Sequence, residues 1–562
     1  MTLTPPGIPR TEPASASGTE RVALPAARAA DSTDLTGVSR GFLAKATLIT
    51  ASLSVAGALL GLVRDQALAR MFGAGSETDA FLIAWTVPEF AATLLIEDGL
   101  AFVLIPAFSM ALARRAQGSA GDPVRSLVAG TLPRLSFGFV AVSTLVAGGA
   151  PYLVEALAPG LPDPRLAVDC TRLTATCVLT FGLAGYCSAA LRAHRRFLAP
   201  AAIYVAYNTG IIATMSLLGE GWGVRSAAAG VAAGGCLMVA VQLPSLWRQL
   251  RNRTSASGAS GVEARPMGLS LLGAVLGFAL CRQSQVLIER FLASTLPAGA
   301  ISHLNYAQKV AQIPMTLSLM LCTVTFPVIA RALADGDTER ARARVERDLA
   351  LASLLLLLGA SAVIACAPQI TELLFQRGAF TAQDTAATAS VLRVYALGLL
   401  GQTLVGVLIR SYFSAGRPTW YPVGAMAAGI IATSWIGVAT VGPWGVPGIA
   451  AANAAGITVT AALLLAGLAS KPGHREPRGV PIRVRPVLAE LSKPLRAAVV
   501  ATVAGALAAS WPESPVAGLL TGCLTVTAVF LPLSRALGAE GCASAFHSVR
   551  TVTRRLTHGR SR

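Results

Sequence analysis

Charged side chains are concentrated in the segment Gly61–Pro88, between two long apolar runs. They are Arg64, Asp65, Arg70, Glu77 and Asp79. A charge inside or beside a membrane span is costly, so it is usually paired or lines a polar cavity. Glycines at Gly73 and Gly75 are typical of a loop that joins two helices. The segment therefore predicts a helix–loop–helix junction at the mouth of a polar cavity in a membrane protein.

Other charges fall within predicted spans further along the chain. The cations of the whole set are Arg64, Arg70, Arg282, Arg290 and Lys309, and the anions are Asp65, Asp79, Glu89, Glu97, Asp98 and Glu289. A guanidinium group offers paired donors that suit phosphate oxygens. Neighbouring carboxylates can neutralise these cations when no ligand is bound, or titrate when they are desolvated. Glu97 and Asp98 are adjacent, so at most one of them should face the cavity.

These charges also have a purely structural interpretation. The neighbours Arg64–Asp65 and Glu289–Arg290 lie near span ends, where ion pairs can lock helices together or sit at the membrane interface. Both interpretations stay open for these two pairs. For Lys309, which lies one turn before Pro314, we favour cavity lining.

The sequence gives little sign of catalysis or nucleotide binding. There is no G-x-x-x-x-G-K-[ST] or H-E-x-x-H motif, and the five histidines fall mostly in loops, so ATP hydrolysis and membrane-hydrolase chemistry are not expected. The nine cysteines are scattered, with no C-x-x-C or Cys/His ligand spacing. We therefore expect no cofactor, no metal and no enzyme activity, which leaves a secondary transporter or a flippase.

The composition indicates an integral membrane protein. The 562 residues are 54% hydrophobic and 13% charged, with a mean hydropathy of +0.61, whereas soluble domains carry about 25% charged residues. Continuous apolar runs of about 20 residues recur, each long enough to cross a bilayer as a helix. We predict about fourteen spans, at 42–63, 79–105, 127–150, 167–190, 198–218, 223–244, 269–292, 309–331, 348–367, 388–410, 420–441, 444–467, 496–511 and 515–537.

The net charge of +18 follows membrane topology rather than nucleic-acid binding. Basic residues gather in alternate loops, which by the positive-inside rule puts both termini in the cytoplasm. An even number of spans requires the same. Residues 1–40 lack the apolar centre of a signal peptide, so we expect a disordered cytoplasmic tail.

An internal repeat relates two pairs of spans. Arg64 and Pro88 are separated by the same distance as Arg290 and Pro314, and each second helix has another proline, Pro106 or Pro327. The repeat predicts two pseudo-symmetric lobes of six helices, with the substrate between them near mid-bilayer. The predicted divisions are a tail at 1–40, an N-lobe at 41–247, a linker at 248–267, a C-lobe at 268–468, a basic loop at 469–495, two further helices at 496–538 and a basic tail at 539–562.

Several segments, in order along the chain, resemble the MurJ/MviN family of lipid II flippases. The first is GLVRDQALARMFGAGSETDAFLIAWTVP at Gly61–Pro88. The others are RRFLAPAAIYVAYN (Arg195–Asn208), RFLASTLPAGAISHLNYAQKVAQIP (Arg290–Pro314), LLFQRGAFTAQDT (Leu373–Thr385) and RSYFSAGRPTWYPV (Arg410–Val423). The resemblance covers roughly residues 40–470. It implies that the protein moves undecaprenyl-pyrophosphate-linked peptidoglycan precursor across the bacterial cytoplasmic membrane, its head group held in a cationic cavity between the lobes.

The resemblance also suggests which residues bind the substrate. We predict a cavity lined by Arg64, Asp65, Asp79, Glu97, Arg282 and Lys309. Three positions depart from the family pattern, because Ala58, Ala92 and Thr93 stand where the family has arginines. An anionic diphosphate would then be held less strongly unless Arg282 compensates.

Other functions remain open on the sequence. The same fold can carry another polyprenyl-linked oligosaccharide, or export a small molecule coupled to a cation. A third hypothesis is a scaffold that recruits cell-wall synthesis proteins without transport. The expected partners are a lipid-linked glycan, membrane lipids and other cell-wall synthesis proteins, with no nucleic acid.

Overall fold

A computed structural model describes residues 40–97, 99–117, 122–251, 269–323, 332, 337–413, 419–469, 479–539 and 541. The chain divides into two compact units, Met1–Leu48 and Ile49–Arg562, and the contacts below lie in the second. The described residues are helical and, apart from an isolated bridge between Ala469 and Ile482, they contain no strand pairing. The prediction of an all-α polytopic membrane protein is confirmed, whereas Asp98, Pro327 and all but residues 40, 539 and 541 of the two predicted tails lie outside the described residues.

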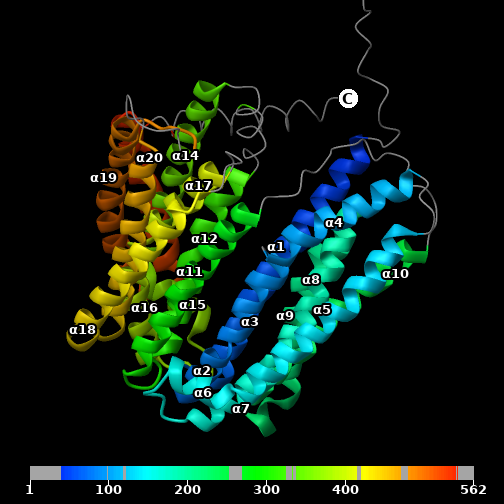
Figure 1. Ribbon diagram of the computed structural model, residues 1–562. Coiled ribbons are helices and arrows are strands. Elements are labelled where there is room, and N and C mark those ends of the chain that lie inside the picture. Colours follow the sequence, from blue (N-terminus) through cyan, green and yellow to red (C-terminus); the bar gives the residue numbers. More distant parts are fainter. Residues whose placement is uncertain are drawn as a thin grey trace, which may run out of the picture. The chain divides into compact units, whose positions relative to one another are not determined.

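The first half of the chain forms helices α1 to α10 (Figure 1). In order these are α1 (Arg40–Phe72), α2 (Ser76–Ala84), α3 (Thr86–Ala91), the π-helix η1 (Ala92–Glu97), α4 (Gly99–Ala116), α5 (Pro123–Gly148), α6 (Ala150–Leu157), α7 (Pro164–Ala175), α8 (Cys177–Ala193), α9 (Leu198–Trp222) and α10 (Arg225–Arg251). Helix α10 packs against α9 and α8, and α8 in turn packs against α4 and α5.

The second half continues from α11 to α20. Its helices are α11 (Leu269–Ser294), α12 (Ala300–Thr323), α14 (Thr338–Ala365), α15 (Ala367–Phe375), α16 (Ala382–Ala396), α17 (Leu399–Phe413), α18 (Tyr421–Gly467), α19 (Val484–Ala509) and α20 (Pro515–Ala536). Helix α18 packs on α11 and α17, and α12 packs on α16 and α14. The last two helices pair with each other, and both pack on α14.

The number of spans stays a prediction. Nine helical runs in the described residues are long and apolar enough to cross a membrane, or ten if α16 and α17, bent by 46°, form one span. Helix α18 counts once among them, although its 47 residues join two helices at Gly445, where φ is +58°. That break falls at the second residue of the predicted span 444–467, close to the predicted boundary with the span 420–441. Helices α1, α11 and α12 are long enough to cross but are not among the nine.

One helix extends beyond its predicted span. The sequence places a basic loop up to residue 495, yet helix α19 begins at Val484. Its first turns are amphipathic: Val487 and Leu491 are buried, and Lys493 pairs with Glu490 at 2.6 Å. Hydropathy alone missed these turns because their charged residues lower the mean value.

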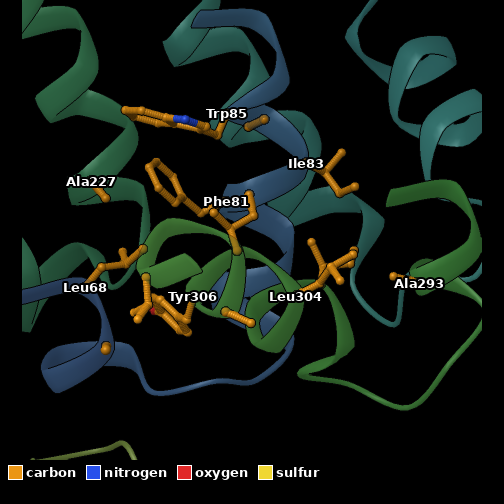
Figure 2. Packing of buried hydrophobic residues seen from close by; sticks show 14 of the residues in the cluster. Leu68, Phe81, Ile83, Trp85, Ala227, Ala293, Leu304 and Tyr306 are labelled. Carbon is orange, nitrogen blue, oxygen red and sulfur yellow. The ribbon is translucent and has the colours of Figure 1, made fainter. Parts of the chain in front are cut away.

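The two halves meet in a shared apolar cluster. Helix α2 contacts α12, and the cluster combines Phe81 and Trp85 of the first half with Leu304 and Tyr306 of the second. Figure 2 shows these side chains close together. Tyr306 also contacts the ring of Phe375, with ring centres 4.9 Å apart. This packing fixes the junction that carries Asp79 against the start of α12.

Candidate functional site

A polar cavity of about 690 Å³ lies between the two halves of the protein. Helix α3 and the π-helix η1 form one wall, and α11, α12, α16, α17 and α18 form the other. The polar side chains that line it are Glu89, Thr93, Glu97, Arg282, Gln283, Gln285, Glu289, Gln308, Gln312, Tyr395, Gln402, Arg410 and Asn453. Polar side chains inside a helical membrane protein favour the bundle interior or a water-filled cavity. Its size falls within the range of about 300–1,000 Å³ that is usual for ligand sites.

Two of the six predicted site residues line this cavity. Glu97 lies at the end of η1 and accepts a hydrogen bond of 3.0 Å from the Tyr204 hydroxyl. Arg282 is exposed on α11. Among the described residues Arg282 has no hydrogen bond or ion pair, so its guanidinium group is available to a ligand.

Three other predicted residues surround a much smaller cavity of about 10 Å³, the space of roughly one water molecule. Arg64 donates to the Asp65 carboxylate at 2.7 Å and to Asn208 Oδ1 at 3.2 Å. Its guanidinium carbon also lies 4.4 Å from the centre of the Trp85 ring, within cation–π range. Lys309 lines the opposite side. The Arg64–Asp65 contact is the ion pair of the structural interpretation, and a role in substrate binding stays a prediction.

Asp79 contacts the other half of the protein instead of either cavity. Its buried carboxylate accepts hydrogen bonds from the backbone N–H of Gly299 at 2.7 Å and of Ser302 at 2.8 Å, and from the Ser302 hydroxyl. These groups begin helix α12, where free N–H groups and the helix dipole favour a negative charge. Asp79 therefore joins α2 to the start of α12.

A hydrogen-bonded seam between α3 and α11 did not emerge from the sequence as a unit. Arg290 donates to the Glu89 carboxylate at 2.8 Å and to the Thr86 hydroxyl. The Gln283 amide, two helical turns before Arg290, donates to the hydroxyl of Thr93, one turn after Glu89. The positions of Glu89 and Thr93, near the proline of the second span, were the only available signal. Thr93 occupies one of the positions where the family has an arginine.

The glutamines of the second half are also functional candidates that the sequence interpretation missed. Gln308 and Gln312 lie four residues apart on α12, so they share one face of the helix. Buried Asn453 donates to the Glu289 carboxylate, which joins α18 to α11 at the cavity wall. A neutral polar residue inside an apolar run was the signal that could have identified them.

The fold and the cavity together define a class of protein. A helical membrane bundle with a polar cavity between its halves is a polytopic membrane transporter. The family model described as lipid II flippase MurJ matches residues 68–513. The chain therefore belongs to the lipid II flippase MurJ family, as its sequence motifs predicted.

Individual relatives agree with this assignment. The lipid II flippase MurJ of Burkholderia cenocepacia is 28% identical over 384 residues, which cover 66% of this chain and 73% of the relative. The probable lipid II flippase MurJ of Rhizobium meliloti is 27% identical over 484 residues, covering 83% and 88% of the two chains.

Solved structures share the fold. A lipid II flippase MurJ in an inward closed conformation superimposes with a TM-score of 0.67 at 19% identity, over 87% of this chain and 98% of the other. An inward-facing MATE family multidrug transporter of the MOP superfamily gives a TM-score of 0.58 at 14% identity, over 74% and 95%. The architecture is thus common to exporters of different cargo.

Proposed function

We propose that this protein is a flippase that moves lipid II from the inner to the outer leaflet of the bacterial cytoplasmic membrane by alternating access. Membership of the MurJ family and the polar cavity between the two halves support this function. The head group would occupy the cavity while the polyprenyl tail stays in the lipid. The protein catalyses no reaction, and its role is in peptidoglycan synthesis.

Both chain termini lie in the cytoplasm in this proposal, as the basic loops indicate. Helix α1 then ends on the outer side of the membrane, and so does α11, because α11 is the sixth span after α1. The contact between Asp79 and the start of α12 would close the outer side. The substrate would enter the cavity from the cytoplasmic side.

The proposal is tested by lipid II exposure on the outer face of proteoliposomes, with and without the protein. The double variant Arg64→Ala/Lys309→Ala removes the two cations of the small cavity. We expect flipping to fall at least tenfold, with normal membrane insertion. Arg225→Ala/Lys493→Ala removes two cations from ion pairs outside both cavities and should flip normally. Normal flipping by the Arg64/Lys309 variant would refute a cationic site there.

A second candidate is export of another polyprenyl-linked oligosaccharide or of a small molecule coupled to a cation. The observation that favours it is the number of carboxylates in the large cavity: Glu89, Glu97 and Glu289 outnumber the arginines that line it. Complementation distinguishes the two functions. If the protein inserts correctly but fails to support a cell depleted of its own lipid II flippase, the second candidate is favoured.

A further inference from the structure

Glutamine side chains form one wall of the large cavity. They come from three helices of the second half: Gln283 and Gln285 from α11, Gln308 and Gln312 from α12, and Gln402 from α17. Five neutral amides that face one space in a membrane protein need an explanation, because an amide without a hydrogen-bond partner costs about 1–3 kcal/mol when buried. We refer to these five residues as the amide wall.

The hydrogen bonds that the amide wall makes within the protein use only some of its donors and acceptors. Gln402 donates to the Tyr395 hydroxyl at 3.2 Å. The Gln283 amide donates to the Thr93 hydroxyl in the seam between the two halves. Within the described residues, the side-chain amides of Gln285 and Gln312 have no hydrogen-bond partner, although the Gln312 backbone carbonyl accepts from the Thr316 hydroxyl. Each amide carries two N–H donors and a carbonyl acceptor, so the wall offers both kinds of group to whatever fills the cavity.

The charges around the amide wall do not suit a diphosphate. Glu97 and Glu289 line the same cavity as Arg282 and Arg410, so the two carboxylates offset the positive charge of the two arginines. Lys309 follows Gln308 on α12 but lines the separate small cavity with Arg64. A phosphate needs concentrated positive charge and N–H donors. Hydroxyl and acetamido groups instead need paired neutral donors and acceptors, which the wall provides.

We propose that the amide wall binds the uncharged saccharide of a lipid-linked substrate, and that the diphosphate is held outside it. The inference rests on the proposed flippase function, since the head group must enter this cavity. Gln312 and Gln285 supply the free donors and acceptors, Gln308 lies one turn from Gln312 on the same face of α12, and Gln402 is oriented by Tyr395. The wall makes the protein prefer a glycosylated polyprenyl diphosphate over a bare one.

Binding of two lipids to the detergent-purified full-length protein tests the proposal. The probes are lipid II and undecaprenyl diphosphate, which lacks the saccharide, and each competes with a fluorescent lipid II. The wild type should prefer lipid II at least tenfold. Gln308→Leu/Gln312→Leu should lose about tenfold or more of that preference, since each hydrogen bond contributes up to about tenfold. Its affinity for undecaprenyl diphosphate should stay within threefold of the wild type.

Gln383→Leu is the matched control, because this glutamine is exposed in the first turn of α16, away from the cavity. It should leave both affinities unchanged. If the double variant does not fold, Gln312→Leu alone serves, since this side chain loses no partner. An unchanged preference, or an equal loss of affinity for both lipids, overturns the amide wall as a saccharide site.

The two proposals fail separately. If wild-type protein flips no lipid II in proteoliposomes but still prefers the glycosylated lipid in the binding measurement, the flippase proposal fails and the saccharide site stands. If it flips lipid II and the variants keep their preference, only the saccharide site fails.

Discussion

Asp79 is the residue whose replacement should most weaken the contact between the two halves. Asp79→Ala would leave the N–H groups of Gly299 and Ser302 buried without an acceptor. An unsatisfied buried polar group costs about 1–3 kcal/mol. We expect a melting temperature several degrees lower for the purified protein, measured by intrinsic fluorescence. Asp169→Ala breaks an exposed pair with Arg225 and should change it little. If Asp79→Ala and the wild type have the same melting temperature, Asp79 does not stabilise the contact between the two halves.

Single residues also show which parts of the candidate site can be predicted from the sequence. Arg282 and Glu97 were identified by type, because a charge in an apolar run is conspicuous, and both line the large cavity. The partner of Asp79 was not predictable, since 220 residues separate it from Gly299 and only the folded chain brings them together. The glutamines were not predicted because a neutral amide carries no charge to mark it as a cavity residue.

Among the structural elements, the turn between α1 and α2 depends on Gly73. Its φ of +67° lies in the left-handed region, and a Cβ there would stand 2.7 Å from the carbonyl oxygen of Ala379 in the other half. A left-handed conformation costs a residue other than glycine about 1–2 kcal/mol. Gly73→Ala should therefore weaken the contact between this turn and the second half of the protein. The expected results are a lower melting temperature and faster labelling of a cysteine placed at Ala74.

Gly75→Ala is the control for this turn. Gly75 lies two residues away, has extended backbone geometry, and a Cβ there would meet nothing within 4 Å. It should melt and label like the wild type with the same reporter cysteine. If both glycine variants behave alike, the left-handed turn at Gly73 is not what holds the halves together.

Regular elements were more predictable than their irregularities. Apolar runs placed most helices, because the bilayer demands about 20 such residues per span. The π-helix at Ala92–Glu97 was not predicted, since no residue type signals the extra residue in its turn. Glycine at position 185 of α8 makes room for it, because a Cβ there would lie 1.9 Å from the Leu95 carbonyl oxygen.

At the scale of the whole molecule, alternating access requires contacts between the halves that form in one state and break in the other. Asp79 joins the two halves at the start of α12, and the seam of Arg290 with Glu89 joins α3 to α11 beside the cavity. Each consists of a small number of bonds, so a head group that binds one state more tightly than the other can offset it. The internal repeat predicted two such lobes, but the residues that link them became evident only in the structure.

The Glu89–Arg290 pair permits a decisive test of this coupling. Its side chains are 23% and 7% exposed, so removing one partner strands a largely buried charge, at a cost of up to about 3–5 kcal/mol. Arg290→Met alone should lower the melting temperature strongly, and Glu89→Gln alone should lower it less. The double variant should recover most of the loss, because no charge is left unpaired. Its flipping rate should differ from the wild type by several-fold, since the seam no longer favours one state. Additive losses of stability would show that the two residues act independently, and an unchanged flipping rate in a stable double variant would show that the seam does not separate during transport.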